Sequence, residues 1–172
     1  CEQEKLSSDS LFGGRPVSIP GNNSHAGQSG WPSGNAWDIM TGVGTPVYSL
    51  YDGTLATWSD YGPTIKFINK KTNKPCTKSE IKNDKCKKLF GQSFTVDSAD
   101  GKPDIYYTHL MNTTVKKGEK VTCGQLLGYV MDFPTSDSDH VHIGVEYGHN
   151  IREFLDDNGN IKCASNKTYT MP

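Results

Sequence analysis

His140 and His142 stand two positions apart in the segment 139–145, a run that is otherwise rich in β-branched residues. Because side chains alternate along a β-strand, the two histidines would share one face and Val141 would take the other. Two imidazoles on one face of a stiff strand can bind a metal ion or share the work of proton transfer. A lone pair of this kind is more often solvated than functional, so its meaning depends on the other polar groups of the chain.

Three residues from separate parts of the chain provide the ligand types of a catalytic zinc site. His25 lies in a glycine-rich loop, Asp38 enters an apolar strand, and His142 belongs to the pair just described. Two imidazole nitrogens and one carboxylate oxygen form a common catalytic zinc set, which leaves the fourth position for water. His109 and His140 would then face that water without binding the metal, and they could accept or deliver protons during hydrolysis.

Other polar and aromatic residues near these segments receive a different interpretation. The fifth histidine, His149, lies in the turn-like segment 148–150, and we predict it at the surface and outside the site. Trp31 and Trp37 could line a groove, and packing in the core is the equal alternative.

The elements that must position these groups are short strands. Alternating residues predict strands at 94–96, 105–110, 125–130 and 141–147, with one helical turn at 151–155. The segment 115–121 also alternates and contains a turn. The density of Gly and Pro in the loop 25–45 excludes a helix there, and the chain would enter a strand near Asp38. The pattern predicts an all-β fold, a compact antiparallel sheet folded as a sandwich or partial barrel, with long loops and little helix.

Turn residues indicate how some of these strands would pair. An Asp-Gly pair at 52–53 separates the alternating runs 45–51 and 54–58, which is a strong hairpin signal. A second turn at 61–63 would lead the chain into a strand at 64–68, which would make another hairpin.

Composition limits the class of protein. The chain has 172 residues, the size of one ordinary domain, and we expect it to be a monomer. Its formal net charge of -1 leaves no basic excess to neutralise phosphates, so we expect no nucleic-acid partner. The lysine-rich segment 69–88 is interpreted as a solvated surface insertion. No apolar run approaches the roughly 18 residues of a transmembrane helix, so no transmembrane segment is expected.

Four of the five cysteines suit two disulfides. Cys76 and Cys86 bracket the lysine-rich insertion, Cys123 and Cys163 lie in turn-like contexts, and none of the four has Cys-x-x-Cys spacing. Pairing Cys76 with Cys86 and Cys123 with Cys163 is the simplest arrangement, although four cysteines allow three. Disulfides predict an oxidising, extracytoplasmic location.

The first residues are interpreted as separate from the domain. Residues 1–20 form a polar tether or edge segment, and residues 21–172 form a single domain that carries the insertion 69–88. Cys1 is followed by polar residues and resembles the cysteine of a mature bacterial lipoprotein, which carries a lipid anchor; an unmatched thiol is the alternative. The protein would be secreted, periplasmic or lipid-anchored, and a virion-associated protein remains open.

Four motifs, in this order along the chain, resemble those of the lysostaphin/LytM-type zinc endopeptidases, which cut peptide bonds in bacterial peptidoglycan. They lie at 38–53, at Tyr107-Thr108-His109-Leu110, at 115–128 and at His140-Val141-His142-Ile143. The resemblance covers about residues 25 to 147. It implies a compact antiparallel β fold with an open groove, a Zn²⁺ cofactor and a peptidoglycan peptide as substrate.

The resemblance also implies a role for each candidate residue. By position, His25, Asp38 and His142 correspond to the family's zinc ligands, and His109 and His140 correspond to its two non-ligating active-site histidines. All five side chains are present, which favours an active zinc metalloendopeptidase, a peptidoglycan hydrolase. Two other classes stay open: an inactive peptidoglycan-binding or amidase-activating module, and a wall-opening component of a phage tail or envelope assembly.

Some features depart from the common pattern of these enzymes. Twelve residues separate His25 from Asp38, more than in many members. This spacing is similar to the β-lytic/staphylolysin branch, which cuts glycine-containing cell-wall peptides, and it implies a modest preference for Gly or Ala beside the cut. The insertion 69–88 does not belong to the common core, and loops of this kind can reshape a groove.

Overall fold

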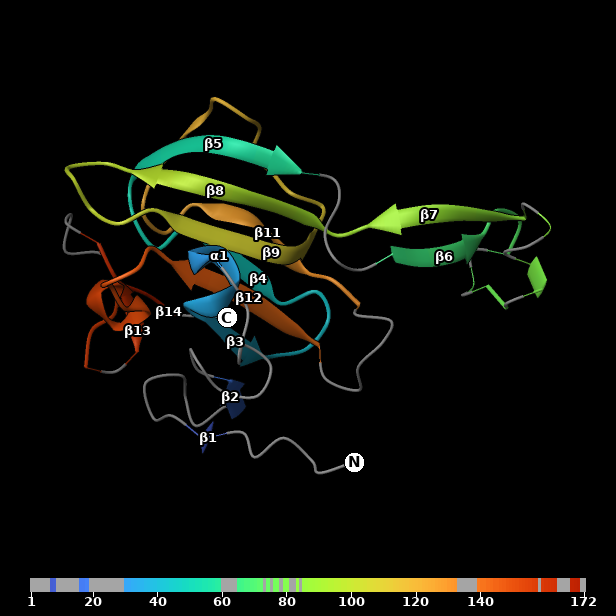
Figure 1. Ribbon diagram of the computed structural model, residues 1–172, viewed down its shortest axis with the longest axis horizontal. Coiled ribbons are helices and arrows are strands. Elements are labelled where there is room, and N and C mark those ends of the chain that lie inside the picture. The colour runs from blue at the N-terminus through green and yellow to red at the C-terminus, as the bar shows by residue number, and fades with distance from the viewer. Residues whose placement is uncertain are drawn as a thin grey trace.

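The protein is described by a computed structural model that covers residues 7–8, 16–18, 30–59, 65–72, 74, 76–77, 79–80, 83, 85–132, 139–157, 159–163 and 168–170. Ten of its described strands form one antiparallel sheet (Figure 1). The prediction of an all-β fold with little helix is confirmed, and the sheet is open and does not close into a barrel.

The main path of the sheet runs β1-β2-β3-β12-β9-β8-β5-β10. Its strands are β1 (Ser7–Ser8), β2 (Pro16–Ser18), β3 (Ala36–Met40), β12 (His140–Val145), β9 (Ile105–Met111), β8 (Gln92–Ser98), β5 (Gly53–Ser59) and β10 (Lys120–Val121). β11 (Leu126–Val130) pairs with β9 and also with β4 (Pro46–Tyr48). Since β12 lies between β3 and β9, side chains from these three strands meet at the middle of the sheet.

Smaller elements complete the described chain. β6 (Ile65–Asn69) pairs with β7 (Cys86–Phe90), and β13 (Asn160–Lys162) pairs with β14 (Thr168–Thr170). One short α-helix, α1 (Trp31–Gly34), precedes β3, and a 3-10 helix, η2 (Ile151–Phe154), follows β12 where the sequence predicts a helical turn. Within the described residues, no helix has the length and apolar character that a membrane crossing requires.

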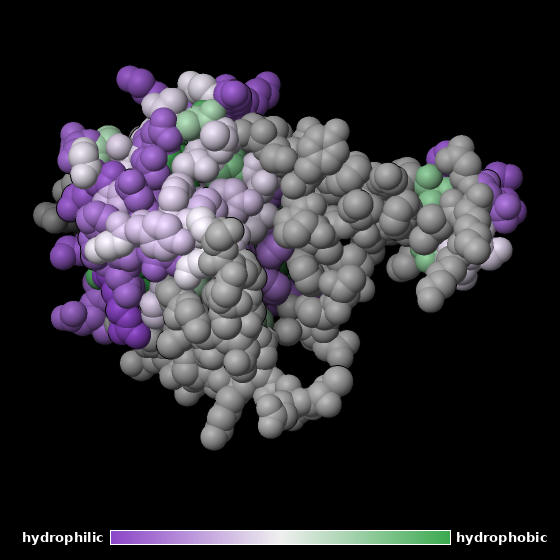
Figure 2. Space-filling view, in the orientation of Figure 1, coloured by the Kyte–Doolittle hydropathy of each residue, from purple (hydrophilic) through white to green (hydrophobic). Residues whose placement is uncertain are grey.

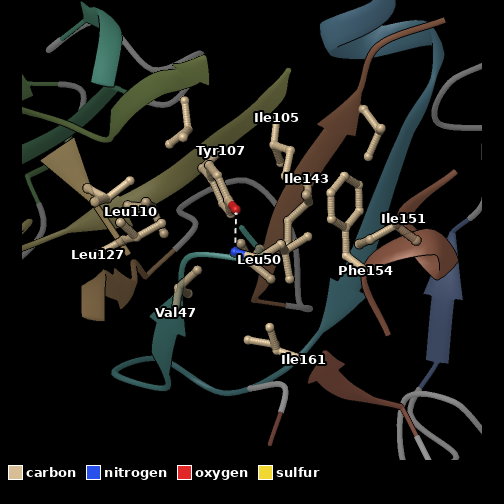
Figure 3. Packing of buried hydrophobic residues seen from close by; sticks show 14 of the residues in the cluster. Val47, Leu50, Ile105, Tyr107, Leu110, Leu127, Ile143, Ile151, Phe154 and Ile161 are labelled. Carbon is tan, nitrogen blue, oxygen red and sulfur yellow. Dashed lines mark hydrogen bonds between the residues drawn. The ribbon is translucent and has the colours of Figure 1, made fainter. Parts of the chain in front are cut away.

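The core lies on one face of the central strands. Ile39, Val141 and Ile143 alternate with the polar residues of β3 and β12 and have no exposed surface. β4, β11 and η2 supply the apolar side chains that cover them (Figure 3). Trp37, at 4% exposure, belongs to this core, so of its two sequence-based interpretations the structure supports packing.

Tyr107 joins the sheet to a loop across the core. Its ring is fully buried and its hydroxyl oxygen accepts a hydrogen bond from the backbone N–H of Leu50 at 2.9 Å (Figure 3). Burial raises the pKa of Tyr107 well above its ordinary value, so the phenol stays neutral. The bond satisfies a buried backbone donor, which would otherwise cost about 1–3 kcal/mol.

Both predicted hairpins in the first half of the chain are wrong in their pairing. β4 does not pair with β5: it pairs with β11, while β5 pairs with β8 and β10. The connection between them is no simple two-residue turn, because Leu50 enters the core there. The strand expected at 64–68 exists as β6, but its partner is β7, so the hairpin closes around the lysine-rich insertion.

The expectation of no helix in 25–45 is also wrong at one place. α1 is a single turn, and Pro32 lies in its first positions, where a missing N–H costs no hydrogen bond. Gly30 precedes it with φ of 88°, a conformation that glycine adopts without strain. Glycine and proline thus bound this turn instead of preventing it.

Both predicted disulfides are confirmed. Cys76 pairs with Cys86 near the far end of the β6–β7 hairpin, and Cys123 pairs with Cys163. The second bond joins residues 40 positions apart and ties the β13 region to the turn after β10. A loop of that length corresponds to about 4 kcal/mol of stabilisation in the chain-entropy estimate.

Candidate active site

Asp38 and His142 face each other across the pair β3–β12. They are register partners in this antiparallel pair, so their side chains share one face of the sheet. Oδ1 of Asp38 lies 2.7 Å from Nδ1 of His142, and the two residues are 6% and 8% exposed. The sequence suggested that Asp38 lies at the entry of a strand, but it lies in the middle of β3.

The other nitrogen of His142 also has a partner. Its Nε2 lies 2.7 Å from the carbonyl oxygen of Pro32 in α1. A carbonyl oxygen can only accept a hydrogen bond, so Nε2 must carry the proton. In the neutral ring Nδ1 then has no proton and presents its lone pair to the Asp38 carboxylate.

Two acceptor atoms at 2.7 Å need a positive charge between them, which is either a second ring proton or a cation. A nitrogen and an oxygen bound to one tetrahedral zinc ion lie about 3.3 Å apart, so a separation larger by about 0.6 Å would admit the metal. The contact of Nε2 with a backbone carbonyl is the outer contact that metal-binding histidines usually make. The donor atoms of Asp38 and His142 therefore fit zinc in type and in orientation.

The predicted third ligand, His25, lies outside the described residues. Among the residues that are described, no group of three or more His, Cys, Asp or Glu side chains is arranged to hold a metal ion. The part of the site that can be described thus supplies two donors, Asp38 and His142, on neighbouring strands.

His140 lies beside these two donors. It is two residues before His142 on β12 and therefore shares its face of the sheet. Its Nε2 is 3.8 Å from Oδ1 of Asp38, and the residue is 9% exposed. At this distance His140 makes no hydrogen bond to Asp38 but lies within the range of a strong charge interaction.

His109 reaches the same face through a β-bulge in β9. The register with β8 shifts here, so that Thr108 and His109 together oppose Ser93. His109 has φ of 64°, in the left-handed region that non-glycine residues rarely adopt. The bulge breaks the alternation of the strand: Tyr107 and Leu110 both face the core, and His109 turns to the side of the other histidines.

The three imidazole rings form a compact cluster. The centroid of the His109 ring is 4.7 Å from that of His140 and 5.7 Å from that of His142, and both contacts are edge to face. Burial lowers the pKa of His109 to about 3, helped by electrostatic interaction with His140 and His142 and opposed by Asp38. His109 is therefore neutral at physiological pH and can accept a proton.

The backbone around His109 is held from the other side of the bulge. The N–H of Met131 donates a hydrogen bond to the His109 carbonyl oxygen at 2.9 Å. Gly91 lies against the same place, since a Cβ added there would clash with the Met131 sulfur and would lie 3.8 Å from the His109 Cα. These contacts fix a backbone conformation that costs of the order of 1–2 kcal/mol.

Gly144 gives α1 its place on the sheet. A Cβ added at Gly144 would lie 2.7 Å from the Pro32 carbonyl oxygen and 3.0 Å from the Pro32 Cα. Contacts this short do not occur, so only glycine lets the α1 backbone approach β12 closely enough to reach His142. Sequence reasoning missed the roles of Gly144 and Pro32, although a glycine within a run of β-branched residues is a known signal of close backbone approach.

The structure brings together four of the five predicted site residues, Asp38, His109, His140 and His142. His149, which was predicted to lie outside the site, does lie apart from these residues. It is exposed, and its Nδ1 is 3.1 Å from Oε2 of Glu153. Sequence reasoning missed the bulge at His109. Tyr107 and Leu110 are three positions apart and would face opposite sides of a regular strand, yet both are core residues, which is the mark of the bulge.

Comparison with known proteins places this geometry in context. The model of Peptidase family M23 matches residues 33–153, which includes all four of these residues. No curated protein matches the chain in sequence. Lysostaphin, an antimicrobial peptidase from Staphylococcus simulans, has a similar structure, with a TM-score of 0.53 and 21% identity over 92% of this chain and 56% of that chain.

Two further solved structures are similar at lower scores. The catalytic domain of lysostaphin from Staphylococcus simulans has a TM-score of 0.47 and 20% identity, over 85% of this chain and 91% of that chain. A variant of the catalytic domain of EnpA, a prophage-encoded M23 protein from Enterococcus faecalis, has a TM-score of 0.46 and 22% identity, over 77% and 79%.

Proposed function

The chain belongs to peptidase family M23, and from this premise we propose that it is a zinc-dependent endopeptidase that hydrolyses peptide bonds in the cross-links of bacterial peptidoglycan. The substrate comes from the resemblance to lysostaphin/LytM-type enzymes in the motifs around Asp38, His109 and His142. The two disulfides suit an extracytoplasmic protein, which is where that substrate lies.

One observation carries the proposal: each ring nitrogen of His142 has a defined partner. Nε2–H donates a hydrogen bond to the carbonyl oxygen of Pro32, and Nδ1 faces the carboxylate of Asp38 at 2.7 Å. Such an arrangement serves a cation held between an imidazole and a carboxylate better than it serves a neutral hydrogen-bonded pair. Asp38 and His142 would hold the zinc, together with His25 as the third ligand.

Zinc, when bound, supplies a Lewis acid that polarises a carbonyl group and lowers the pKa of water to about 7. The residues of the chain do the rest of the work. His109, neutral because it is buried, accepts a proton from the attacking water or returns one to the leaving amine. His140, whose ring contacts that of His109, takes the complementary part.

Holding these groups in fixed positions is the contribution of the fold. Asp38 and His142 lie within strands that have backbone ladders on both sides, and His140 pairs with Met40 on one side, which restricts their movement. His109 lies at a bulge that Met131 and Gly91 hold. A preorganised polar site reduces the reorganisation that the reaction itself would need.

Digestion of purified peptidoglycan tests the proposal. Sacculi that differ in cross-bridge chemistry are incubated with the zinc-loaded protein, and the soluble products are identified by mass. We expect new free amino groups and fragments cut within cross-links, with a modest preference for Gly or Ala beside the cut. A chelated sample and the His149→Ala variant are the controls, the first inactive and the second fully active.

Other outcomes would assign the chain to another class. Release of sugar-linked fragments with intact peptides would mean that the target is not a peptide bond. Binding to sacculi with no product from any of them, although zinc is bound, would favour the inactive binding or amidase-activating module.

A further inference from the structure

The β6–β7 hairpin carries a large share of the positive charge of the protein. We call residues 65–90 the lysine arm. The arm has nine of the 18 basic residues and two of the 19 acidic ones, which gives it a formal charge of +7, while the rest of the chain has -8. The lysines are Lys66, Lys70, Lys71, Lys74, Lys78, Lys82, Lys85, Lys87 and Lys88. The net charge of -1 for the whole chain therefore conceals two regions of opposite sign.

The lysine arm projects from the main sheet. Figure 1 shows β6 and β7 extending beyond the ends of β5 and β8, away from the rest of the molecule. The described residues at its far end include many that are hydrophilic (Figure 2). Lys70, Lys71, Lys74 and Lys85 are all exposed there. A projection of this kind presents its charge to a partner without interference from the acidic body.

Hydrogen bonds join the described residues at the far end of the lysine arm. Asn69, at 8% exposure, accepts the N–H groups of Lys71 and Thr72 through Oδ1 and donates through Nδ2 to Oε1 of Glu80 at 2.7 Å. Oε2 of Glu80 accepts from the N–H and the hydroxyl of Thr77. Glu80 is the one acidic residue of this region that the structure describes, and both of its carboxylate oxygens already accept hydrogen bonds.

Two further constraints act on the same segment. The Cys76–Cys86 disulfide closes it covalently, and the N–H of Lys70 donates to the Lys85 carbonyl oxygen at 2.9 Å. The N–H of Asn69 donates to the carbonyl oxygen of Lys74 at 2.9 Å. These constraints act on the described residues of the segment, and an ionic partner would not have to offset the entropy of fixing those residues.

The lysines border a hollow. It has a volume of about 440 Å³ and is lined by Asn69, Lys70, Lys71, Thr72, Glu80 and Lys85. Three lysines and two neutral polar residues line this concave surface, together with Glu80, whose carboxylate oxygens are both engaged within the lysine arm. Such a lining suits an anionic group with several acceptor oxygens. A phosphate diester has that chemistry, and lysine binds phosphate as a point charge without demanding one fixed geometry.

We propose that the lysine arm binds a phosphodiester-linked polymer of the bacterial cell wall. Several charges along an ordered projection match repeating charges along a chain better than they match a single small anion. The disulfides indicate an extracytoplasmic compartment, and the choice of a wall polymer rests on the proposed function, since the proposed substrate is itself part of the wall.

The position of the lysine arm gives such binding a use. Its last strand continues through Gly91 into β8, and Gly91 lies against His109. The far end of the lysine arm is separated from Gly91 by the length of β7. A polymer held there would stay tethered to the domain that carries the proposed active site, and material attached to that polymer would have a raised effective concentration at that site. Binding itself needs no hydrolysis, so it can be measured apart from the proposed peptidase activity.

Two charge-matched variants test the proposal. In the first, Lys70, Lys71, Lys74 and Lys85 are changed to Gln. In the second, four exposed lysines of the body are changed to Gln: Lys102, Lys116, Lys117 and Lys120. Both variants have the same formal charge, so a general effect of net charge would act on both equally. A third variant, with Arg at the four positions of the lysine arm, keeps the charge.

Binding of a soluble, fluorescently labelled glycerol phosphate polymer is measured by titration from 50 to 200 mM salt. Four lysines predict a slope of about -3 in log K against log salt, hence about 50-fold weaker binding at the higher salt. We expect the first variant to lose at least tenfold in affinity at 50 mM salt, and the body variant and the Arg variant to stay within about twofold. Circular dichroism and thermal unfolding verify that all three are folded.

Several results would overturn the proposal. Equal losses in the first and second variants would mean that net charge, and not the lysine arm, decides the affinity. Equally tight binding of polyglutamate would remove the preference for phosphodiesters. Tighter binding of phosphatidylglycerol vesicles or of single-stranded DNA would assign the surface to a membrane or to nucleic acid instead.

Discussion

The carbonyl oxygen of Pro32 lies 2.7 Å from Nε2 of His142, across the contact between α1 and β12. This bond orients the ring so that Nδ1 faces Asp38. It depends on a third residue, since α1 can lie this close to the sheet only where Gly144 has no side chain. A turn of four residues thus helps to set the direction of the proposed metal ligand.

The first prediction is that Gly144→Ala weakens zinc binding. The added Cβ would meet the Pro32 backbone at 2.7 Å, so α1 must move and the bond to His142 is lost or lengthened. Loss of such an outer contact typically costs 10–100-fold in metal affinity. Competition with a chromophoric chelator measures the affinity.

The matched control for that variant is Gly42→Ala. A Cβ at Gly42 would meet nothing within 4 Å and its φ is not in the left-handed region, so we expect unchanged affinity. Wild-type affinity in Gly144→Ala would show that the Pro32 contact does not orient His142.

The second prediction concerns zinc content. His142→Ala should bind close to one equivalent of zinc less than the wild type, because it removes a nitrogen ligand and leaves Asp38 without its partner. Metal analysis after dialysis gives the content, and His149→Ala, at the surface, should keep its zinc. Equal zinc in His142→Ala and the wild type would remove His142 from the metal site.

The third prediction separates His109 from the ligands. His109→Ala should keep zinc and lower turnover by roughly 10²–10⁴, the usual contribution of a general acid or base. The measurements are metal content and kcat on a soluble cross-link peptide. If zinc and turnover disappear together, His109 is a ligand and the assignment of roles is wrong.

The fourth prediction uses the backbone of His109. At φ of 64° the Cβ of any residue other than glycine destabilises the fold by about 1–2 kcal/mol, and glycine has no Cβ. His109→Gly should therefore be more stable than His109→Ala by about 1 kcal/mol. The order is the reverse of that in a regular strand, where glycine is the weaker residue. Urea unfolding of the two variants decides, and a more stable Ala variant would mean that the bulge relaxes when the imidazole is removed.

The fifth prediction concerns pH. Burial raises the pKa of Asp104, and the charges of Asp97 and Glu146 act in the same direction, against a hydrogen bond from the Ser98 N–H. The folded state therefore holds this proton more tightly than the unfolded state. The resulting stabilisation is complete below the unfolded pKa of about 3.9 and is lost as pH rises through the higher folded value.

It follows that Asp104→Asn should be more stable than the wild type at pH 7. Asn keeps an oxygen that can accept from Ser98 but carries no charge. The gain should shrink as pH falls towards 4, because the wild-type carboxyl is then protonated in the fold as well. Thermal unfolding at both pH values measures this, and a gain that grows as pH falls would reverse the sign of the shift.

Much of the local structure could be predicted from the sequence. The period of two placed His140 and His142 on one face of a strand, since that relationship depends only on neighbouring residues. The short loop between Cys76 and Cys86 made their pairing the simplest one, which the structure has. The helical turn at 151–155 followed from its local pattern in the same way.

Which strands pair was beyond the local pattern. The Asp-Gly signal at 52–53 suggested a hairpin of β4 with β5, but β4 pairs with β11, whose residues lie about 80 positions later. Burial of Leu50 and its bond to Tyr107 draws the chain into the core at this point. Contacts over such distances depend on the packing of the whole sheet, which a window of ten residues does not contain.

By itself, the sequence determined the strand content, the shared face of His140 and His142, and the side chains available for chemistry. Only the tertiary structure decided how these become a site. It pairs Asp38 with His142, turns His109 to their side by a bulge, and brings a backbone carbonyl of α1 onto the ring of His142. Alternation along a strand is set by bonds between neighbours, whereas a bulge and a close backbone approach are set by what packs against the strand from elsewhere.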